Sequence, residues 1–122
     1  MNIDGPIIKI KDGVFMVRGE RVVTAETAAA FYEVTPRALL CAVARNRRKF
    51  AGKFMFSLTR HERAELPARH VLRREEVVFT ELGVSMLATV LNSPKAAQIN
   101  VEIVREVVRT LRSLGLSVWD TL

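Results

Sequence analysis

A cluster of cations in the middle of the sequence is its clearest chemical feature. It opens the stretch ARNRRKFAGKFMFSLT, which spans residues 44–59. The members of the cluster are Arg45, Arg47, Arg48 and Lys49, interrupted only by Asn46. Arginine can hold a phosphate or a base edge with two parallel donors, and the amide of Asn46 can pair with adenine or else cap the end of its own helix. These residue types indicate binding to a nucleic acid rather than catalysis.

The surplus of positive charge is confined to one third of the chain. Residues 34–74 hold 11 of the 19 Lys and Arg residues but 2 of the 13 acids, a net charge of +9. The other 8 cations and 11 acids give −3, so the whole chain carries +6. A basic surface that serves only solubility would spread its charge more evenly. Double-stranded DNA is therefore the expected partner, since such a local field attracts a polyanion.

Catalytic and metal-binding patterns are sparse in the sequence. It has no glycine-rich phosphate loop, no paired-cysteine metal motif and no obvious Ser/His/acid arrangement. His61 and His70 do not share a helical face, so we expect no metal site built from them and Cys41. Glu75 and Glu76 precede a predicted strand and point to opposite sides of it, unlike a catalytic carboxylate pair. We expect no enzyme, no cofactor and no metal.

The length of 122 residues and the hydrophobic content of 49% fit a single domain, residues 1–122, with one core. The longest apolar stretch, residues 80–91, contains Glu81 and is shorter than the roughly 20 residues of a membrane span. The N-terminus has no long apolar signal segment, and a single cysteine, Cys41, cannot form an internal disulfide. These features predict a cytoplasmic protein with no membrane association.

Two short helices are predicted to carry the cation cluster. Before them, β-prone runs at residues 7–10 and 14–17 flank Asp12-Gly13 and predict a small N-terminal hairpin. Thr24 can cap the first helix, and Thr35-Pro36 can start the second as N-cap and first helical residue. A three-residue turn between two such helices is the arrangement of a helix-turn-helix.

The second helix has two faces of different character. Its inward stripe consists of Leu39, Leu40 and Val43. Three- and four-residue spacing places Arg37, Cys41, Arg45 and Arg48 on another side. Cys41 is small enough to let a DNA backbone approach, although a buried small hydrophobe is the alternative role for this residue. The residues expected on flanking phosphates are Arg47, Lys49 and Lys53, with Arg60 and Arg63 either extending this track or simply exposed.

The segments that follow predict the scaffold of an α+β fold with short strands. Phe54, Phe56 and Leu58 alternate as on one face of a half-buried strand. Thr59 and Glu62 match a capping box, which starts a short helix. A strand at residues 75–80 then leads directly into a helix.

Two C-terminal helices complete the predicted fold. Thr80 caps the first of them, and Ser93-Pro94 starts the second, which is expected to end near residue 114. The apolar stripe of this last helix is expected to pack on the core. Its breadth also suggests that the protein forms a homodimer, through Val104, Val108, Leu111 and Leu114.

Four segments carry a resemblance to a known family. They are VRGERVV, FYEV, RNRRKFAGKFMFSLTRHE and FTELGVSMLATVLNSPKAAQINVEIVREVV, and they fall within residues 8–114. In this order they resemble the N-terminal domain of phage open-reading-frame-six proteins (ORF-six-N). That family is grouped with the KilA-N and Bro-N domains of phages and large DNA viruses.

The resemblance implies a compact α+β DNA-binding domain, often fused to an antirepressor or other C-terminal module. By position, the helix of Leu39 and Val43 with Arg45 and Asn46 matches the DNA-contacting helix of the family. The sequence departs from the family at Glu33, Ala51 and Lys53, where glycine, proline and an acid are usual. Glu33 therefore requires an inter-helix turn that either avoids left-handed backbone geometry or is strained.

The leading interpretation is a prophage-type transcriptional regulator that binds double-stranded DNA in the nucleoid of a bacterial host. The alternative is an antirepressor-like module that binds an acidic host or phage protein. A DNA nuclease is a third reading, for which the sequence shows no acid cluster that would hold a metal.

Overall fold

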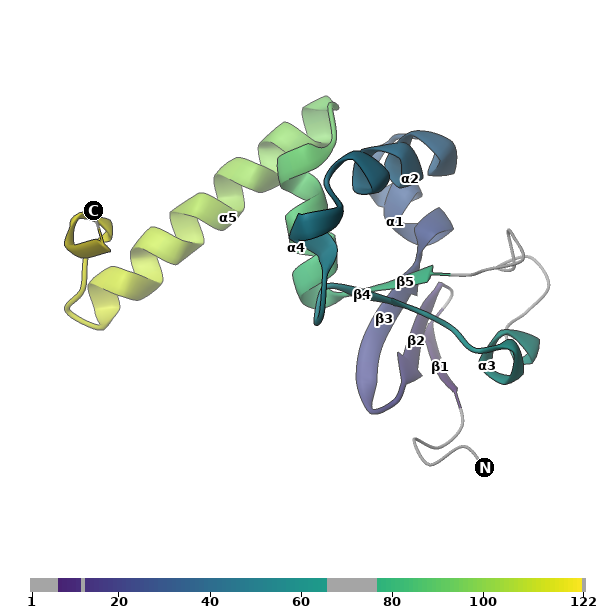
Figure 1. Ribbon diagram of the computed structural model, residues 1–122. Helices are drawn as coiled ribbons and strands as arrows, with labels where there is room; N and C mark the ends of the chain where they lie inside the picture. Colours follow the sequence, from purple (N-terminus) through teal and green to yellow (C-terminus); the bar gives the residue numbers. More distant parts are fainter. Residues whose placement is uncertain (1–6, 12, 66–76, 122) are drawn as a thin grey trace.

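The computed structural model describes residues 7–11, 13–65 and 77–121, and places them in an antiparallel sheet against which helices pack (Figure 1). The strands are β1 (Ile8–Lys11), β2 (Val14–Val17), β3 (Glu20–Thr24), β4 (Met55–Ser57) and β5 (Val77–Thr80). Their order in the sheet is β1-β2-β3-β5-β4, so β5 lies between strands that precede it in the chain. The predicted α+β class and N-terminal hairpin are confirmed.

Each α-helix begins where the sequence predicts it. The helices are α1 (Ala25–Tyr32), α2 (Pro36–Arg45), α3 (Arg60–Ala64), α4 (Glu81–Val90) and α5 (Pro94–Ser113), with 3-10 turns η1 (Arg47–Phe50) and η3 (Val118–Thr121). Their N-caps are Thr24, Thr35, Thr59, Thr80 and Ser93. Every one of these hydroxyls accepts a backbone N–H of the first turn, which would otherwise lack a partner.

The turn between α1 and α2 adopts the strained form. Glu33 has φ 60° and ψ 41°, in the left-handed region where a side chain costs about 1–2 kcal/mol. Its N–H donates to the carbonyl of Ala30 at 3.2 Å, and the N–H of Val34 donates to that of Ala29 at 3.0 Å. These bonds close the end of α1 and allow α2 to start at Pro36 after a short connection.

The larger buried cluster lies between the sheet and helices α1, α2 and α4. Its bulkiest members are Tyr32, Leu39, Phe79 and Leu87. The hydroxyl of Tyr32 donates to the carbonyl of Val84 at 2.6 Å, and Ser93 donates to the carbonyl of Tyr32 at 2.9 Å. Burial raises the pKa of Tyr32 to about 12, so the hydroxyl keeps the proton that it donates.

A smaller cluster covers the opposite face of the sheet. Its buried members are Phe15, Val17, Val22, Leu58 and Val78. Phe56 packs on this cluster together with Leu58, as the alternation predicts. Phe54, however, packs into the larger cluster on the other face. The prediction that it shares a face with Phe56 is wrong because β4 begins only at Met55, so Phe54 stands outside the alternation.

Arg18 and Glu62 close the edge of the smaller cluster. The guanidinium of Arg18 donates to the two carboxylate oxygens of Glu62 at 3.0 and 2.8 Å and lies 4.5 Å from the ring centroid of Phe56. The same carboxylate accepts the N–H of Thr59 at 2.9 Å, which completes the capping box of α3. The hydrogen bond from Arg18 holds the pKa of Glu62 below its usual value, against the opposing effect of burial.

Helix α5 packs on α4 through its first half and then extends away from the rest of the molecule (Figure 1). Ala96 is buried, and Ile99 and Ile103 pack against the larger cluster. Farther along, large apolar residues such as Val107 are exposed. None of the helices in the described part of the chain is both long enough and apolar enough to cross a membrane.

Candidate nucleic-acid interface

The outer face of α2 presents the predicted cations to solvent. Arg37, Cys41 and Arg45 are all exposed, whereas Leu39 and Val43 on the opposite side are buried. The successive four-residue steps from Arg37 through Cys41 to Arg45 form one row along the helix. Since Cys41 is an exposed free thiol, its alternative role as a buried hydrophobe is wrong.

The cation row continues from α2 into η1 through Asn46. The side-chain amide of Asn46 donates to the carbonyl of Ala42 at 2.7 Å, and its backbone N–H donates to that of Val43 at 3.0 Å. Its own carbonyl accepts the N–H of Lys49 at 2.9 Å, so one residue ends α2 and starts η1. Of the two roles predicted for Asn46, capping its own helix is the one that its contacts fulfil.

Phe50 fixes the orientation of η1. Its side chain is 2% exposed, and its ring meets that of Phe79 edge to face, with 6.2 Å between the centroids. Arg47, Arg48 and Lys49, the other three residues of this turn, are exposed. Because a single turn buries Phe50 in the core, its remaining side chains must project outward.

A close contact between α4 and the chain before β4 holds the next cation, Lys53. The hydroxyl of Thr80 accepts the N–H of Gly83 at 3.2 Å and donates to the carbonyl of Lys53 at 2.6 Å. The N–H of Thr80 also donates to the carbonyl of Phe54 at 3.1 Å. A Cβ at Gly83 would lie 1.9 Å from that carbonyl oxygen, so only glycine permits this approach. The side chain of Lys53 is exposed, and these contacts hold the backbone to which it is attached in place.

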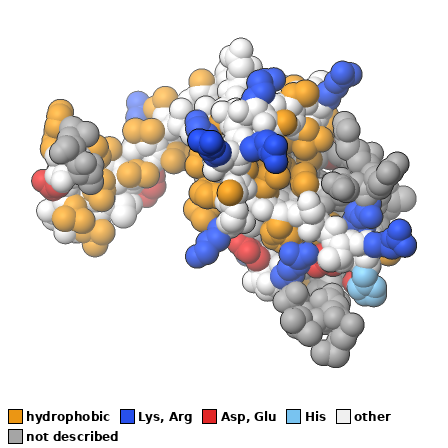
Figure 2. Space-filling view, in the orientation of Figure 1, with side chains coloured by type: hydrophobic (Ala, Val, Ile, Leu, Met, Phe, Trp, Pro, Cys, Tyr) orange, Lys and Arg blue, Asp and Glu red, His pale blue; other side chains and the backbone are white. Residues whose placement is uncertain are grey.

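Among the described residues, the cations of this surface have no acidic partners. We call it the cationic face and define it by Arg37, Arg45, Arg47, Arg48, Lys49 and Lys53. With the residues that the structure describes, none of these side chains forms an ion pair or a side-chain hydrogen bond. Figure 2 shows Lys and Arg side chains on the upper part of the body without a visible acidic side chain beside them, and further Lys and Arg side chains lower down, near the acidic side chains visible in this view. Unpaired cations of this kind are available to bind phosphate.

Two predicted phosphate ligands, Arg60 and Arg63, lie apart from the cationic face. Both belong to α3, which Figure 1 shows at the opposite end of the sheet from α2. Arg60 is exposed. Arg63 is partly buried, and its Nε is buried without a hydrogen-bond partner among the described residues. The basic residues Arg69, Arg73 and Arg74 fall outside the described part of the chain.

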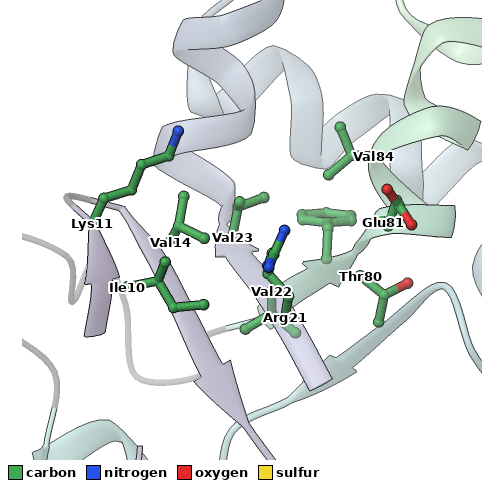
Figure 3. Close-up of a pocket in the computed structure, with 10 residues that line it drawn as sticks. Ile10, Lys11, Val14, Arg21, Val22, Val23, Thr80, Glu81 and Val84 are labelled. Carbon is green, nitrogen blue, oxygen red and sulfur yellow. The ribbon is translucent and has the colours of Figure 1, made fainter. Parts of the chain in front are cut away.

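A second surface feature is a hollow of about 420 Å³ beside the N-terminal hairpin (Figure 3). Val14, Val23 and Phe79 are among the apolar residues that line it, and the charged residues in its lining are two exposed cations and one exposed acid: Lys11, Arg21 and Glu81. Figure 3 shows the side chains of Lys11 and Arg21 on the helix side of the sheet. The hollow is too apolar for phosphate alone but could take an apolar side chain next to an acid.

No group of three potential metal ligands among His, Cys, Asp and Glu comes together in the described residues. His61 pairs instead with Glu65, four residues along, at 3.6 Å. Cys41 and His61 lie on different helices, α2 and α3, and His70 falls outside the described residues.

Comparison with known proteins bears on the segment that builds this surface. The family model of the ORF6N domain matches residues 12–90. The chain belongs to the ORF6N domain family. Within the ORF6N match lie α1, α2, η1, β4, β5 and α4, that is, every element that carries or supports the cationic face. Helix α5 and η3 follow the matched residues. No curated protein and no solved structure matches the chain.

Sequence reasoning missed how the ORF6N segment supports its own cations. The roles of Phe50 and Gly83 depend on contacts with residues far away in the chain, Phe79 and Phe54. A signal was present nevertheless, because the two stretches that carry these residues, RNRRKFAGKFMFSLT and FTELGVSML, are the most diagnostic of the resemblance.

Proposed function

We propose that this ORF6N domain binds double-stranded DNA as a regulator of phage or prophage type, through the cationic face. In this proposal α2 enters a groove, with Arg37, Arg45 and Arg48 directed at the DNA and Cys41 allowing close approach. Arg47, Lys49 and Lys53 bind the flanking phosphates. Asn46 acts by holding η1 in place.

One observation carries the proposal. The cationic face concentrates exposed cations that have no acidic partner in the described part of the chain, on a backbone fixed by Phe50 and Thr80. A face that served only solubility would have no use for such rigid support. Preorganised cations bind phosphates at a smaller entropic cost than flexible ones.

The experiment is duplex DNA binding measured over a range of salt concentrations, for the wild-type protein, Arg45→Ala and Arg48→Ala. Each lost phosphate contact should flatten the slope of log K against log[salt] by about 0.9. A lost base contact should cost about 1–3 kcal/mol and relax the preference at one position. Selecting bound duplexes from a random pool at moderate salt would reveal whether the wild-type protein prefers a sequence.

The matched control is Lys9→Ala, which removes one exposed cation from β1, away from α2. We expect it to leave the salt slope close to that of the wild-type protein. If Arg45→Ala and Arg48→Ala behave like this control, the cationic face is not the DNA-binding surface.

The hollow in Figure 3 supports a second candidate function, binding of an acidic protein in the manner of an antirepressor. Lys11 and Arg21 beside apolar residues suit a partner segment that combines an acid with an apolar side chain. Under this alternative the protein would bind no duplex DNA but would recover an acidic partner in a pull-down. Arg21→Ala would weaken that capture, and Arg45→Ala would not.

We further propose that the protein acts by binding, without catalysis or a cofactor, in the cytoplasm of a bacterial host where its DNA lies. Incubating plasmid DNA with the protein and Mg²⁺ or Mn²⁺ tests this directly. Nicking above the background of the metal alone would establish a nuclease and contradict the proposal.

A further inference from the structure

The apolar residues of α5 occupy two neighbouring faces, and the molecule covers one of them. Ala96, Ile99 and Ile103 lie on the face that packs against the body. The second face turns away from the body and carries Val101 and Val104, which are 49% and 55% exposed. Figure 1 shows that the helix continues well beyond its contact with α4, so the body of the molecule does not cover this second face along its middle.

The second face has the spacing by which helices pack against one another. Ala97, Val101, Val104, Val108 and Leu111 follow at intervals of four, three, four and three residues. This is the alternation of a coiled-coil seam, in which each side chain fits between residues of the facing helix. Val101 and Val108 take one of the two alternating positions of this spacing, and Ala97, Val104 and Leu111 take the other. We call these five residues the α5 seam.

The chain end adds a hollow and a projecting aromatic ring next to the α5 seam. After Gly115 the chain folds back, and the N–H of Leu116 donates to the carbonyl of Leu111 at 2.8 Å. Val104 and Val108 then line a hollow of about 380 Å³ together with Val118 and Trp119 of η3. The side chain of Trp119 is 80% exposed. Tryptophan is enriched at the centres of protein interfaces and is seldom left in water without one.

We propose that the α5 seam, with Trp119, binds the same surface of a second copy of this chain, forming a two-fold symmetric dimer. The regular spacing lets the α5 seam of one copy pack against the same seam of another copy. A two-fold symmetric pair therefore covers the exposed seams of both copies at once. The polar side of α5 carries both signs of charge and includes the internal pair of Arg109 with Glu106. The charges around the α5 seam therefore do not favour a strongly acidic or strongly basic partner, whereas those of the cationic face favour an acidic one.

The size of the surface sets the expected strength of the dimer. A standard interface takes roughly 800 Å² and about 20–30 residues from each partner. The α5 seam and η3 offer fewer residues than that, so we expect a dimer that dissociates on dilution rather than a permanent one. Because α5 extends away from α2 and η1, pairing leaves the cationic face free, and the dimer would present two such faces to one DNA (Figure 1). This last consequence depends on the proposed function; the dimer itself does not.

The test is the molar mass of the full chain without DNA, measured by sedimentation over a wide range of concentrations in reducing buffer. We expect the mass to rise from 13.7 kDa toward twice that value. Val104→Glu should raise the dissociation constant by at least about tenfold, because it places a carboxylate in an apolar interface. The matched control is Leu82→Glu on α4, where Leu82 is 53% exposed and outside the seam, and it should leave the constant unchanged.

Three outcomes would overturn the proposal: a monomer at every concentration, a dimer that Val104→Glu does not weaken, or equal weakening by Leu82→Glu. Circular dichroism of both variants shows whether the helices remain intact. A dimer that appears only without reductant would be a disulfide through the exposed Cys41, and would count against the seam. Arg45→Ala should leave the dimer unchanged, so failure of DNA binding and failure of the dimer can be told apart.

Discussion

At the scale of single residues, Asn46 shows how a polar side chain next to cations can serve the scaffold. Its amide is committed to the carbonyl of Ala42, and its backbone connects α2 to η1. An amide that reads adenine must offer its donor to the base. In this structure one of the two amide N–H groups already donates to Ala42, which holds the side chain against its own helix, so Asn46 positions the cations on either side of it.

Replacing Asn46 with alanine tests this assignment. We expect Asn46→Ala to lower the free energy of unfolding by about 1 kcal/mol, since one partly buried hydrogen bond is lost. The preferred DNA sequence should stay the same. Urea unfolding and selection of bound duplexes measure the two effects. Unchanged stability together with a lost preference at one base pair would show that Asn46 reads DNA after all.

A second single-residue prediction concerns Glu62 and acid stability. The pKa of Glu62 is lowered from 4.5, chiefly by its hydrogen bond to Arg18. A carboxylate with a lowered pKa in the folded state stabilises the fold above its unfolded pKa, and this contribution is lost as the pH falls through the folded pKa. Glu62→Gln should therefore cost about 1–2 kcal/mol at neutral pH and flatten the loss of stability below about pH 4.5.

Urea unfolding at several pH values measures this dependence. Glu20→Gln, at an exposed position of β3, is the control and should keep the steep acid limb. If Glu62→Gln keeps it as well, another carboxylate governs acid unfolding. The sequence could not predict the ion pair because Arg18 and Glu62 are 44 residues apart and meet only when the sheet forms. The capping box of the same Glu62 was predictable because it depends on a spacing of three residues.

At the scale of elements, α4 and the chain before β4 approach each other so closely that only glycine fits at position 83. The sequence predicted the α-helix starts from their caps, because capping is a local interaction. It did not predict η1 or the place of β5 between β3 and β4, since both depend on packing between distant segments. The cations of the surface were thus visible in the sequence, while their support from α4 was not.

Gly83→Ala tests that support. The added methyl group would meet the carbonyl of Phe54, so backbone must move, and we expect a loss of about 1–3 kcal/mol in stability. The shift should also displace Lys53, which Thr80 holds through its carbonyl, and weaken DNA binding. Ser85→Ala on the same helix is the control for both measurements. Wild-type stability and DNA affinity in Gly83→Ala would show that the contact is not needed.

At the scale of the whole molecule, two surfaces of opposite character lie far apart. The cationic face gathers charge on α2 and η1 that has no acidic partner among the described residues, whereas one face of the outer half of α5 is apolar and lies beyond the ORF6N match. Composition predicted the first, because the charge is concentrated in one window of the sequence. The breadth of the apolar stripe in the last helix indicated the second surface, that of α5. In the fold, one part of the apolar stripe of α5 packs on the body and the other part faces solvent, so core packing and the proposed pairing use different residues of the stripe.

The two surfaces should respond to salt in opposite ways. DNA binding releases counterions, so its affinity should fall steeply as salt rises, by a slope of about 0.9 for each phosphate contact. Apolar association carries no such penalty and is strengthened by salts such as sulfate. The dimer should therefore hold or tighten over the same range of salt in which the DNA complex dissociates. Fluorescence anisotropy of a labelled duplex and sedimentation of the free protein measure the two curves. A dimer that dissociates with added salt would mean that charge, rather than the apolar α5 seam, joins the two copies.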